Sequence, residues 1–405
     1  MRHPVDDKAR TSSVVALAFL IGSTAFAVDG SIPAIPEVAD HFLSGIGTAQ
    51  MTVGLFLLGY GLGQLPIGFL ADYYGRRPTV LIGMTLFVVM GLLGALSESI
   101  STLLVSRFLQ GLFGASGAVI SRAIARDITD GPETLRLMSI LTSALGTAMV
   151  TAPLLGGITL DLVGWRTTFG LSALLGAIGL GLTFVFLPET RKARPTTSPL
   201  ATAVRSAMAF SESRQSMLAM ALVGLSFCAL ITFVTTSSEF LIQERALSEI
   251  HYALFFSTMS LGYVGGGMAS RAVAKKLDPG QIVFLIGSAF LSCAGMLVVY
   301  ALLSLTSLWI LLVLLALFFA CIASMLAVAT AIALAPLPQS AAMASALLGT
   351  FQIMCGSTCA LALTFWEGDT EILIIGAYAI FSVAIFPLSV VMKNHMTSVS
   401  TQPGQ

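Results

Sequence analysis

Two charged residues stand apart in this sequence because each lies well inside a long apolar stretch. Asp29 is in the first such stretch and Arg107 is in the fourth. Charges inside a bilayer are costly, and those that are retained there usually have a function. A carboxylate can bind and release a proton, and a neighbouring guanidinium changes its proton affinity. Asp29 and Arg107 are therefore the first candidates for proton coupling or for contact with a substrate.

The composition indicates the setting in which these residues work. The chain has 405 residues, of which 56% are hydrophobic and only 10% are charged. Soluble domains usually carry about 25% charged residues, so this composition indicates a membrane protein. The formal net charge is zero, and no basic field is present that would attract nucleic acid.

Twelve apolar stretches are long enough to cross a bilayer, most of them with about 20 residues or more. They must be helices, because lipid offers the backbone polar groups no other partner. The first stretch is too long for the apolar region of a signal peptide, so no cleavable signal is expected. The stretches cover 14–36, 51–71, 79–97, 102–124, 137–160, 167–187, 216–238, 252–274, 281–303, 308–335, 342–365 and 372–392.

The distribution of basic residues predicts the orientation. With the N-terminus inside, all but three of the 20 Lys and Arg residues lie on the cytoplasmic side, and the exceptions are Arg107, Arg166 and Arg245. Cytoplasmic loops of membrane proteins carry such an excess. We therefore expect both termini to lie in the cytoplasm, and the protein to lie in a bacterial inner membrane.

This orientation places the two intramembrane charges at similar depth. Both lie about 8–9 Å below the outer surface at 1.5 Å of rise per residue, so they could pair or share a polar cavity. A purely structural ion pair is the alternative. Glu239, at the outer end of the seventh stretch, could meet a cationic substrate across the bundle interface from Asp29, although a solvated helix end is the simpler interpretation.

One long polar segment divides the spans six and six, and part of it, around 200–212, could form an interfacial helix. The tripeptide Leu-Gly-Tyr at 58–60 recurs at 261–263, at the same point of the second helix in each half. Two parallel six-helix repeats are a transporter architecture. The expected fold is an all-α integral membrane protein with an N-terminal bundle (1–190), a cytoplasmic linker (191–215), a C-terminal bundle (216–393) and a cytoplasmic tail (394–405).

The positions of the histidines and cysteines give little support for a metal site or for a catalytic nucleophile. The four histidines lie outside the apolar stretches, and the five cysteines lie inside them without C-x-x-C spacing. We therefore expect no metal site and no cofactor, and an enzyme is disfavoured.

A cluster of charged residues and glycines lies between the second and third stretches, and it could hold one conformation of the protein. It resembles motif A of the major facilitator superfamily (G-x-x-x-D-[RK]-x-G-R-[RK]), with Tyr73 where Arg or Lys is usual. The resemblance implies that an acid at the end of the fourth helix joins the cluster. The C-terminal repeat has Lys275 in place of the acid, so this latch is one-sided. The latch residues are Gly68, Asp72, Gly75, Arg76, Arg77 and Asp127.

Further motifs extend the resemblance over the whole chain. Residues 107–111 resemble motif B, whose arginine is implicated in proton coupling. Residues 152–157 resemble the antiporter motif C, with Pro153, Gly156 and Gly157. Residues 165–169 and 188–190 bracket the sixth helix as in twelve-span drug:proton antiporters. Residues 29–36 resemble a signature of the bicyclomycin/chloramphenicol-resistance (Bcr/CflA) branch, with Gly30-Ser31 in place of Met-Tyr.

The resemblance implies a monomeric, proton-coupled exporter of small organic molecules that works by alternating access between the two bundles. Its partners would be a small-molecule substrate, protons and the lipid bilayer. A facilitator, importer or exporter of an endogenous metabolite is the nearest alternative. A membrane receptor or sensor without transport is an alternative of another class.

Overall fold

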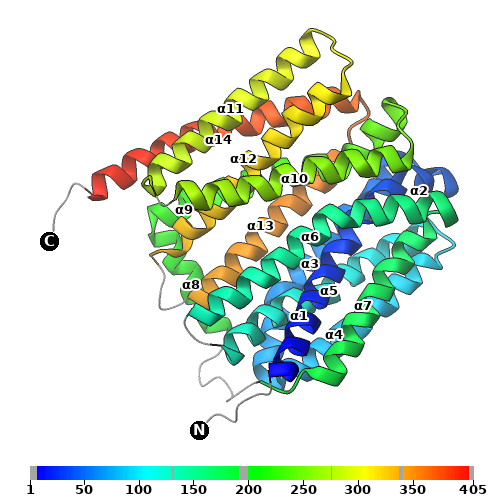
Figure 1. The fold of residues 1–405 in the computed structure, drawn as a ribbon, viewed down its shortest axis with the longest axis vertical. Helices are drawn as coiled ribbons and strands as arrows, with labels where there is room; N and C mark the ends of the chain where they lie inside the picture. Colours follow the sequence, from blue (N-terminus) through cyan, green and yellow to red (C-terminus); the bar gives the residue numbers. More distant parts are fainter. Residues whose placement is uncertain (1–6, 130–131, 191–198, 275, 337–340, 401–405) are drawn as a thin grey trace. The chain divides into compact units, whose positions relative to one another are not determined.

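The computed structural model describes residues 7–129, 132–190, 199–274, 276–336 and 341–400, and every regular element in them is a helix. The chain separates into two compact units. Unit 1 comprises Met1–Pro199 with Ala246–Ala253, and unit 2 comprises Leu200–Arg245 with Leu254–Gln405. Figure 1 shows the long helices of each unit running side by side. The domain boundaries 190 and 216 remain predictions.

The first span of unit 1 is broken where the sequence places its buried acid. Helix α1 (Asp7–Asp29) ends at Asp29, a 3₁₀ turn η1 (Ile32–Ala34) follows, and the short helix α2 (Ile35–His41) completes the span. Pro33 and Pro36 have no N–H to donate, so an unbroken α-helix cannot continue through them. The other helices of unit 1 are α3 (Ile46–Tyr74), α4 (Arg76–Ala95), α5 (Ile100–Ile128), α6 (Pro132–Val163) and α7 (Arg166–Phe186).

Glycines bring α3 and α5 into close contact. A Cβ atom at Gly59 would overlap the Phe108 carbonyl, and one at Gly111 would overlap the Phe56 carbonyl. Small residues allow transmembrane helices to approach in this way, because lipid provides no hydrophobic drive for their association. This approach sets Arg107 of α5 beside the ring of Phe56.

Unit 2 repeats this packing. A Cβ atom at Gly262 or Gly266 of α10 would overlap the backbone of Ala316 or Ala320 of α12. The helices of unit 2 are α8 (Pro199–Glu212), α9 (Arg214–Ser238), the π-helical turn η2 (Glu239–Glu244), α10 (Glu249–Val273), α11 (Pro279–Leu302), α12 (Leu308–Leu334), α13 (Ala341–Leu363) and α14 (Thr370–Ser400). The first residues of α10, up to Ala253, belong to unit 1.

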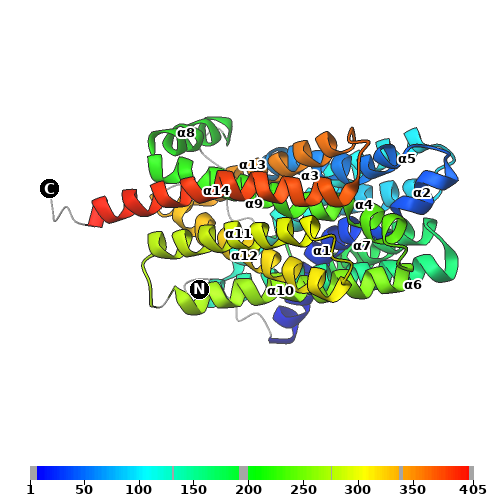
Figure 2. The ribbon, with the colours of Figure 1, turned by 90° about the horizontal axis from the view of Figure 1, so that it is seen from above.

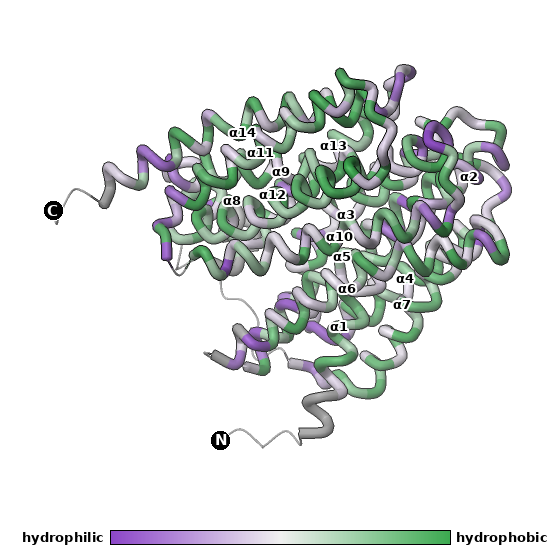
Figure 3. The backbone as a smooth tube through the Cα atoms, turned by 45° about the horizontal axis from the view of Figure 1, so that its top comes forward, coloured by the Kyte–Doolittle hydropathy of each residue, from purple (hydrophilic) through white to green (hydrophobic). Residues whose placement is uncertain are grey.

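The predicted fold of twelve spans is confirmed. Eleven helices of the described residues are long and apolar enough to cross a membrane. The remaining predicted span is α10, a helix of 25 residues that contains four glycines and three serines. Figure 3 shows that hydrophobic residues dominate the long helices and that hydrophilic residues gather near their ends.

The linker contains a helix where the sequence pattern was weak. Helix α8 exposes the apolar side chains of Val204 and Met208. Figure 2 shows it at the edge of unit 2, while Ser206 and Phe210 on its other face are buried. Its position at the membrane interface remains a prediction.

The α3–α5 contact leads to a first prediction. Gly111→Val should push the two helices apart and lower the free energy of unfolding by about 2–3 kcal/mol, because added methyl groups overpack the contact. Gly170→Val is the matched control, since a Cβ atom there meets nothing within 4 Å. Thermal unfolding of the purified protein in detergent measures both. Equal melting temperatures for the two variants would contradict this account of the packing.

Candidate functional site

Arg107 is fully buried in unit 1. Its guanidinium donates hydrogen bonds to Gln110 Oε1 at 2.6 Å and to the Ala27 carbonyl at 2.7 Å. Longer bonds reach Ser31 Oγ and the Thr52 carbonyl, both at 3.4 Å. In the described part of the chain no carboxylate forms an ion pair with Arg107. Neutral oxygen atoms, including two backbone carbonyls, therefore solvate this buried cation.

Aromatic rings complete the surroundings of the guanidinium. Its carbon atom lies 4.5 Å from the ring centroid of Phe56 and 5.3 Å from that of Phe169. Such cation–π contacts contribute about 2 kcal/mol when they are desolvated. Gln110 is itself held by a hydrogen bond from its Nε2 to Ser172 Oγ at 3.1 Å. Residues of α1, α3, α5 and α7, together with Ser31 just beyond α1, thus fix the position of one charge.

Asp29 lies at the end of α1 and is buried. Among the described residues its carboxylate forms no ion pair, so the structure does not join it directly to Arg107. Arg107 instead bonds the carbonyl of Ala27, two residues before Asp29, and this carbonyl also accepts a bond from Ser31 Oγ at 3.1 Å. The C-terminal end of a helix carries a partial negative charge that favours a cation and disfavours an anion. Asp29 and Arg107 therefore act on the same helix end with opposite charge.

The glycine and proline motif of α6 meets this helix end. A Cβ atom at Gly156 would overlap the carbonyl of Gly30, the residue after Asp29, and Pro153 lies inside α6 one turn earlier. A Cβ atom at Gly157 would lie 2.8 Å from the Cβ atom of Ala253, which belongs to the same unit. The sequence separates motif C from Asp29 by more than a hundred residues, and only the fold brings them together.

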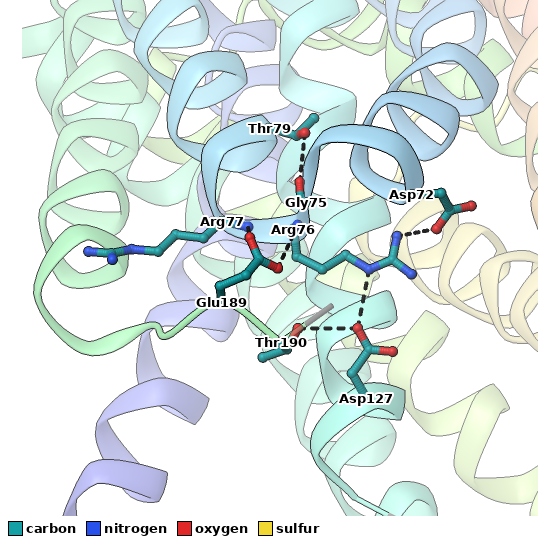
Figure 4. A network of polar contacts seen from close by, with 8 residues as sticks. All are labelled: Asp72, Gly75, Arg76, Arg77, Thr79, Asp127, Glu189 and Thr190. Carbon is teal, nitrogen blue, oxygen red and sulfur yellow. Dashed lines mark hydrogen bonds and ion pairs between the residues drawn. The ribbon is translucent and has the colours of Figure 1, made fainter. Parts of the chain in front are cut away.

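A second polar network joins the ends of α3, α4 and α5 (Figure 4). Arg76 contacts Asp72 through Nη1 at 2.5 Å and Asp127 through Nε at 3.2 Å. Thr190 donates a hydrogen bond to the same oxygen of Asp127 at 3.1 Å. The structure thus brings together the three charged residues that the motif A resemblance implied.

Glu189 adds a function that the sequence analysis missed. Its carboxylate accepts the backbone N–H groups of Arg76 at 3.0 Å and Arg77 at 3.2 Å. These are free N–H groups of the first turn of α4, and an acid at a helix N-terminus is favourable. Gly75 adopts φ 115° just before the helix, a conformation that favours glycine. A Cβ atom there would lie 2.5 Å from Glu189 Oε2.

Beyond its backbone bond to Glu189, Arg77 makes side-chain contacts outside this network, and Gly68 lies outside it altogether. Arg77 donates a hydrogen bond to the Phe184 carbonyl at 2.8 Å and lies over the Phe184 ring. Gly68 makes no close helix contact, because a Cβ atom there would meet only Val119 at an ordinary 3.8 Å. Gly59 and Gly111 form the tight contacts of these helices instead.

The remaining candidate is Glu239, a half-buried residue at the start of the π-helical turn η2 in unit 2. The five cysteines are free thiols. Among the described residues, no group of three or more His, Cys, Asp and Glu side chains is arranged to hold a metal ion.

Comparison with known proteins gives a family. Residues 17–363 match the model of the Major Facilitator Superfamily. The chain is 27% identical over 380 residues to a bicyclomycin resistance protein homologue of Haemophilus influenzae, covering 92% of this chain and 94% of that protein. It is 36% identical over 182 residues to the uncharacterised MFS-type transporter YdgK of Bacillus subtilis, and there it spans less than half of the relative, 45%.

A solved structure supports the fold. The chain resembles a bacterial homologue of the human lysosomal transporter Spinster in an inward-facing conformation, with a TM-score of 0.76 over 99% of this chain and 100% of that one. The two sequences are 14% identical, so the likeness concerns the fold alone.

The capping bonds of Glu189 lead to a second prediction. Glu189→Ala should speed hydrogen exchange of the Arg76 and Arg77 amides, because a helix cap is lost. The free energy of unfolding should fall by about 1 kcal/mol. Glu212→Ala, at an exposed acid of α8, is the control. Hydrogen-exchange mass spectrometry of the peptide that contains the start of α4 measures both variants. Unchanged exchange in Glu189→Ala would show that this carboxylate does not cap α4.

Proposed function

Because this chain belongs to the major facilitator superfamily and is therefore a multi-pass membrane transporter, we propose that it is a proton-coupled exporter of small organic molecules, including drugs. One observation carries the proposal. A buried carboxylate, Asp29, ends a broken helix two residues after the carbonyl that binds the buried cation Arg107. A transporter that uses no titrating group has no need for such a pair of buried charges.

The geometry supports a competition for Arg107. In this structure the guanidinium bonds the neutral Ala27 carbonyl, and a protonated Asp29 would leave that bond in place. When Asp29 loses its proton, its carboxylate becomes a stronger acceptor for a guanidinium than the Ala27 carbonyl two residues earlier. Movement of Arg107 toward Asp29 would remove a hydrogen bond from the end of α1. The protonation state would then alter the helix break, against which Gly156 of α6 packs.

The second network supplies a conformational latch. Arg76 ties Asp72 of α3 to Asp127 of α5, and Glu189 fixes the start of α4 that carries Arg76. These contacts are made between helix ends, so relative movement of α3 and α5 would break them. The latch would hold one state of an alternating-access cycle, and the proton at Asp29 would set which state is favoured.

The direction and setting complete the proposal. The excess of basic residues on one side favours cytoplasmic termini in a bacterial inner membrane, where proton-driven exchange removes the substrate from the cell. We assign the working protein as a monomer. The name of the Haemophilus relative, a bicyclomycin resistance protein homologue, supports a drug-like substrate.

The coupling is tested in proteoliposomes with an imposed pH gradient, a panel of bicyclomycin, chloramphenicol and a fluorescent organic cation, and wild type beside Asp29→Asn. Wild type should accumulate substrate against its gradient, by up to about tenfold per pH unit for each proton exchanged. Asp29→Asn should lose accumulation and keep substrate binding. Equal transport with and without the gradient, unchanged in Asp29→Asn, would contradict proton coupling and favour a facilitator.

Arg107 gives a third prediction. Arg107→Gln should lower gradient-driven transport at least about 100-fold, because removal of the cation leaves the Ala27 carbonyl and Gln110 without their partner and ends the competition with Asp29. Arg107→Lys keeps the charge but lacks the planar fork, so an intermediate loss is expected. Initial rates in the same proteoliposomes measure the series. Full activity in Arg107→Gln would rule out a function for this cation.

A further inference from the structure

The C-terminal end of α9 has an unusual backbone. After Ser238 the helix continues as the six-residue π-helical turn η2, and the N–H of Arg245 bonds the Phe240 carbonyl, five residues earlier, at 3.0 Å. π-Helical turns are rare and occur frequently at functional sites. The first residue of this turn is Glu239, for which the sequence left two interpretations, a solvated helix end and contact with a cationic substrate.

Two residues at the other end of the turn connect it to α14. Arg245 Nη2 forms an ion pair with Glu371 Oε2 at 2.6 Å, and both side chains are about four-fifths buried. Glu244 Oε1 accepts the backbone N–H of Thr370 at 2.8 Å and so caps the start of α14 from a distant part of the chain. Glu244, Arg245, Thr370 and Glu371 form what we call the α9–α14 clamp.

Aromatic side chains hold the arginine of the clamp in place. Its guanidinium carbon lies 5.5 Å from the centroid of the Phe240 ring, inside the same turn. Tyr300 of α11, which is 1% exposed, donates its hydroxyl to the Ser307 carbonyl at 3.4 Å. A partly desolvated pair with fixed geometry is worth more than an exposed one. The turn η2 and the start of α14 therefore meet at Arg245.

The corresponding helix ends of unit 1 also meet, but with different chemistry. There the end of the first span touches the start of the sixth, through His41 and Arg166 at 3.3 Å and through the rings of Phe42 and Trp165 at 5.4 Å. No π-helical turn precedes this contact, and no ion pair forms between these residues. The ion pair and the π-helical turn thus occur together in unit 2.

The π-helical turn has a physical consequence for Glu239. A π-helical turn contains an additional residue, and its conversion to α-helix would rotate the residues on one side of it by about 100° relative to the other. The clamp holds Glu244 and Arg245 at the far end of the turn in place. It therefore fixes the direction of the Glu239 side chain at the near end. We infer that Arg245 and Glu244 are positioning residues that aim Glu239 at the positively charged group of a cationic substrate. This inference rests on the proposed export function.

The test uses the full chain in proteoliposomes and substrate counterflow without a pH gradient, so that a failure of proton coupling leaves it intact. The probes are tetraphenylphosphonium, a permanent cation, and chloramphenicol, which is neutral. Arg245→Gln and Glu239→Gln should each raise KM for the cation about tenfold, with little change in KM for chloramphenicol. In the double variant, KM for the cation should be at most about twofold higher than in either single variant. The charge exchange of Arg245→Glu with Glu371→Arg should restore most of the affinity.

The matched control is Asp369→Asn. Asp369 accepts the Ile372 N–H at 2.9 Å and so caps the same helix start, but it forms no ion pair with Arg245. Its substitution should leave both KM values unchanged. The inference would be overturned if Asp369→Asn raised KM for the cation as much as Arg245→Gln does. The inference would also be overturned if the increases in KM from Arg245→Gln and Glu239→Gln multiplied in the double variant. It would be overturned as well if wild type did not bind tetraphenylphosphonium.

Discussion

Arg107 sets the constraint on which unit 1 depends, because a guanidinium buried at membrane depth must be solvated by the protein itself. No carboxylate of the described residues pairs with it, so carbonyl and amide oxygens and aromatic rings supply this solvation. The donated bond to Ala27 is available because α1 ends at Asp29, where helix carbonyls lack N–H partners. The glycine contacts of α3 with α5, and of α6 with the helix break, bring these groups into range. The broken first span and the buried cation therefore require each other.

The two units fix their helix starts by the same physical device. In unit 1, Glu189 reaches back to the first N–H groups of α4, and in unit 2, Glu244 reaches forward to the first N–H group of α14. In each case an arginine directly beside the cap forms an ion pair with an acid, Arg76 in the first case and Arg245 in the second. The cap and the ion pair lie side by side, so movement of either helix end would break both contacts together. Such contacts suit a protein that must hold two distinct conformations.

Hydropathy alone was sufficient to predict the helical fold, because a membrane accepts few other structures. The cluster of Asp72, Arg76 and Asp127 could also be predicted, because opposite charges at helix ends in a known pattern have few other partners. The partners of Arg107 could not, since every residue has a backbone carbonyl and the one that accepts is selected by the helix break. The cap at Glu189 and the π-helical turn after Ser238 likewise depend on tertiary contacts. The tight contacts of Gly59 and Gly111 were not predicted either, because the sequence does not show which glycines face a neighbouring helix.

In the proposed cycle Asp29 carries a proton that substrate binding displaces. Purified wild-type protein in weakly buffered detergent solution, mixed with a saturating transported drug, should release about one proton per molecule bound, as followed with a pH-sensitive dye. Asp29→Asn should bind the same drug and release none. Equal proton release by wild type and Asp29→Asn, at equal binding, would contradict the assignment of Asp29 as the proton carrier.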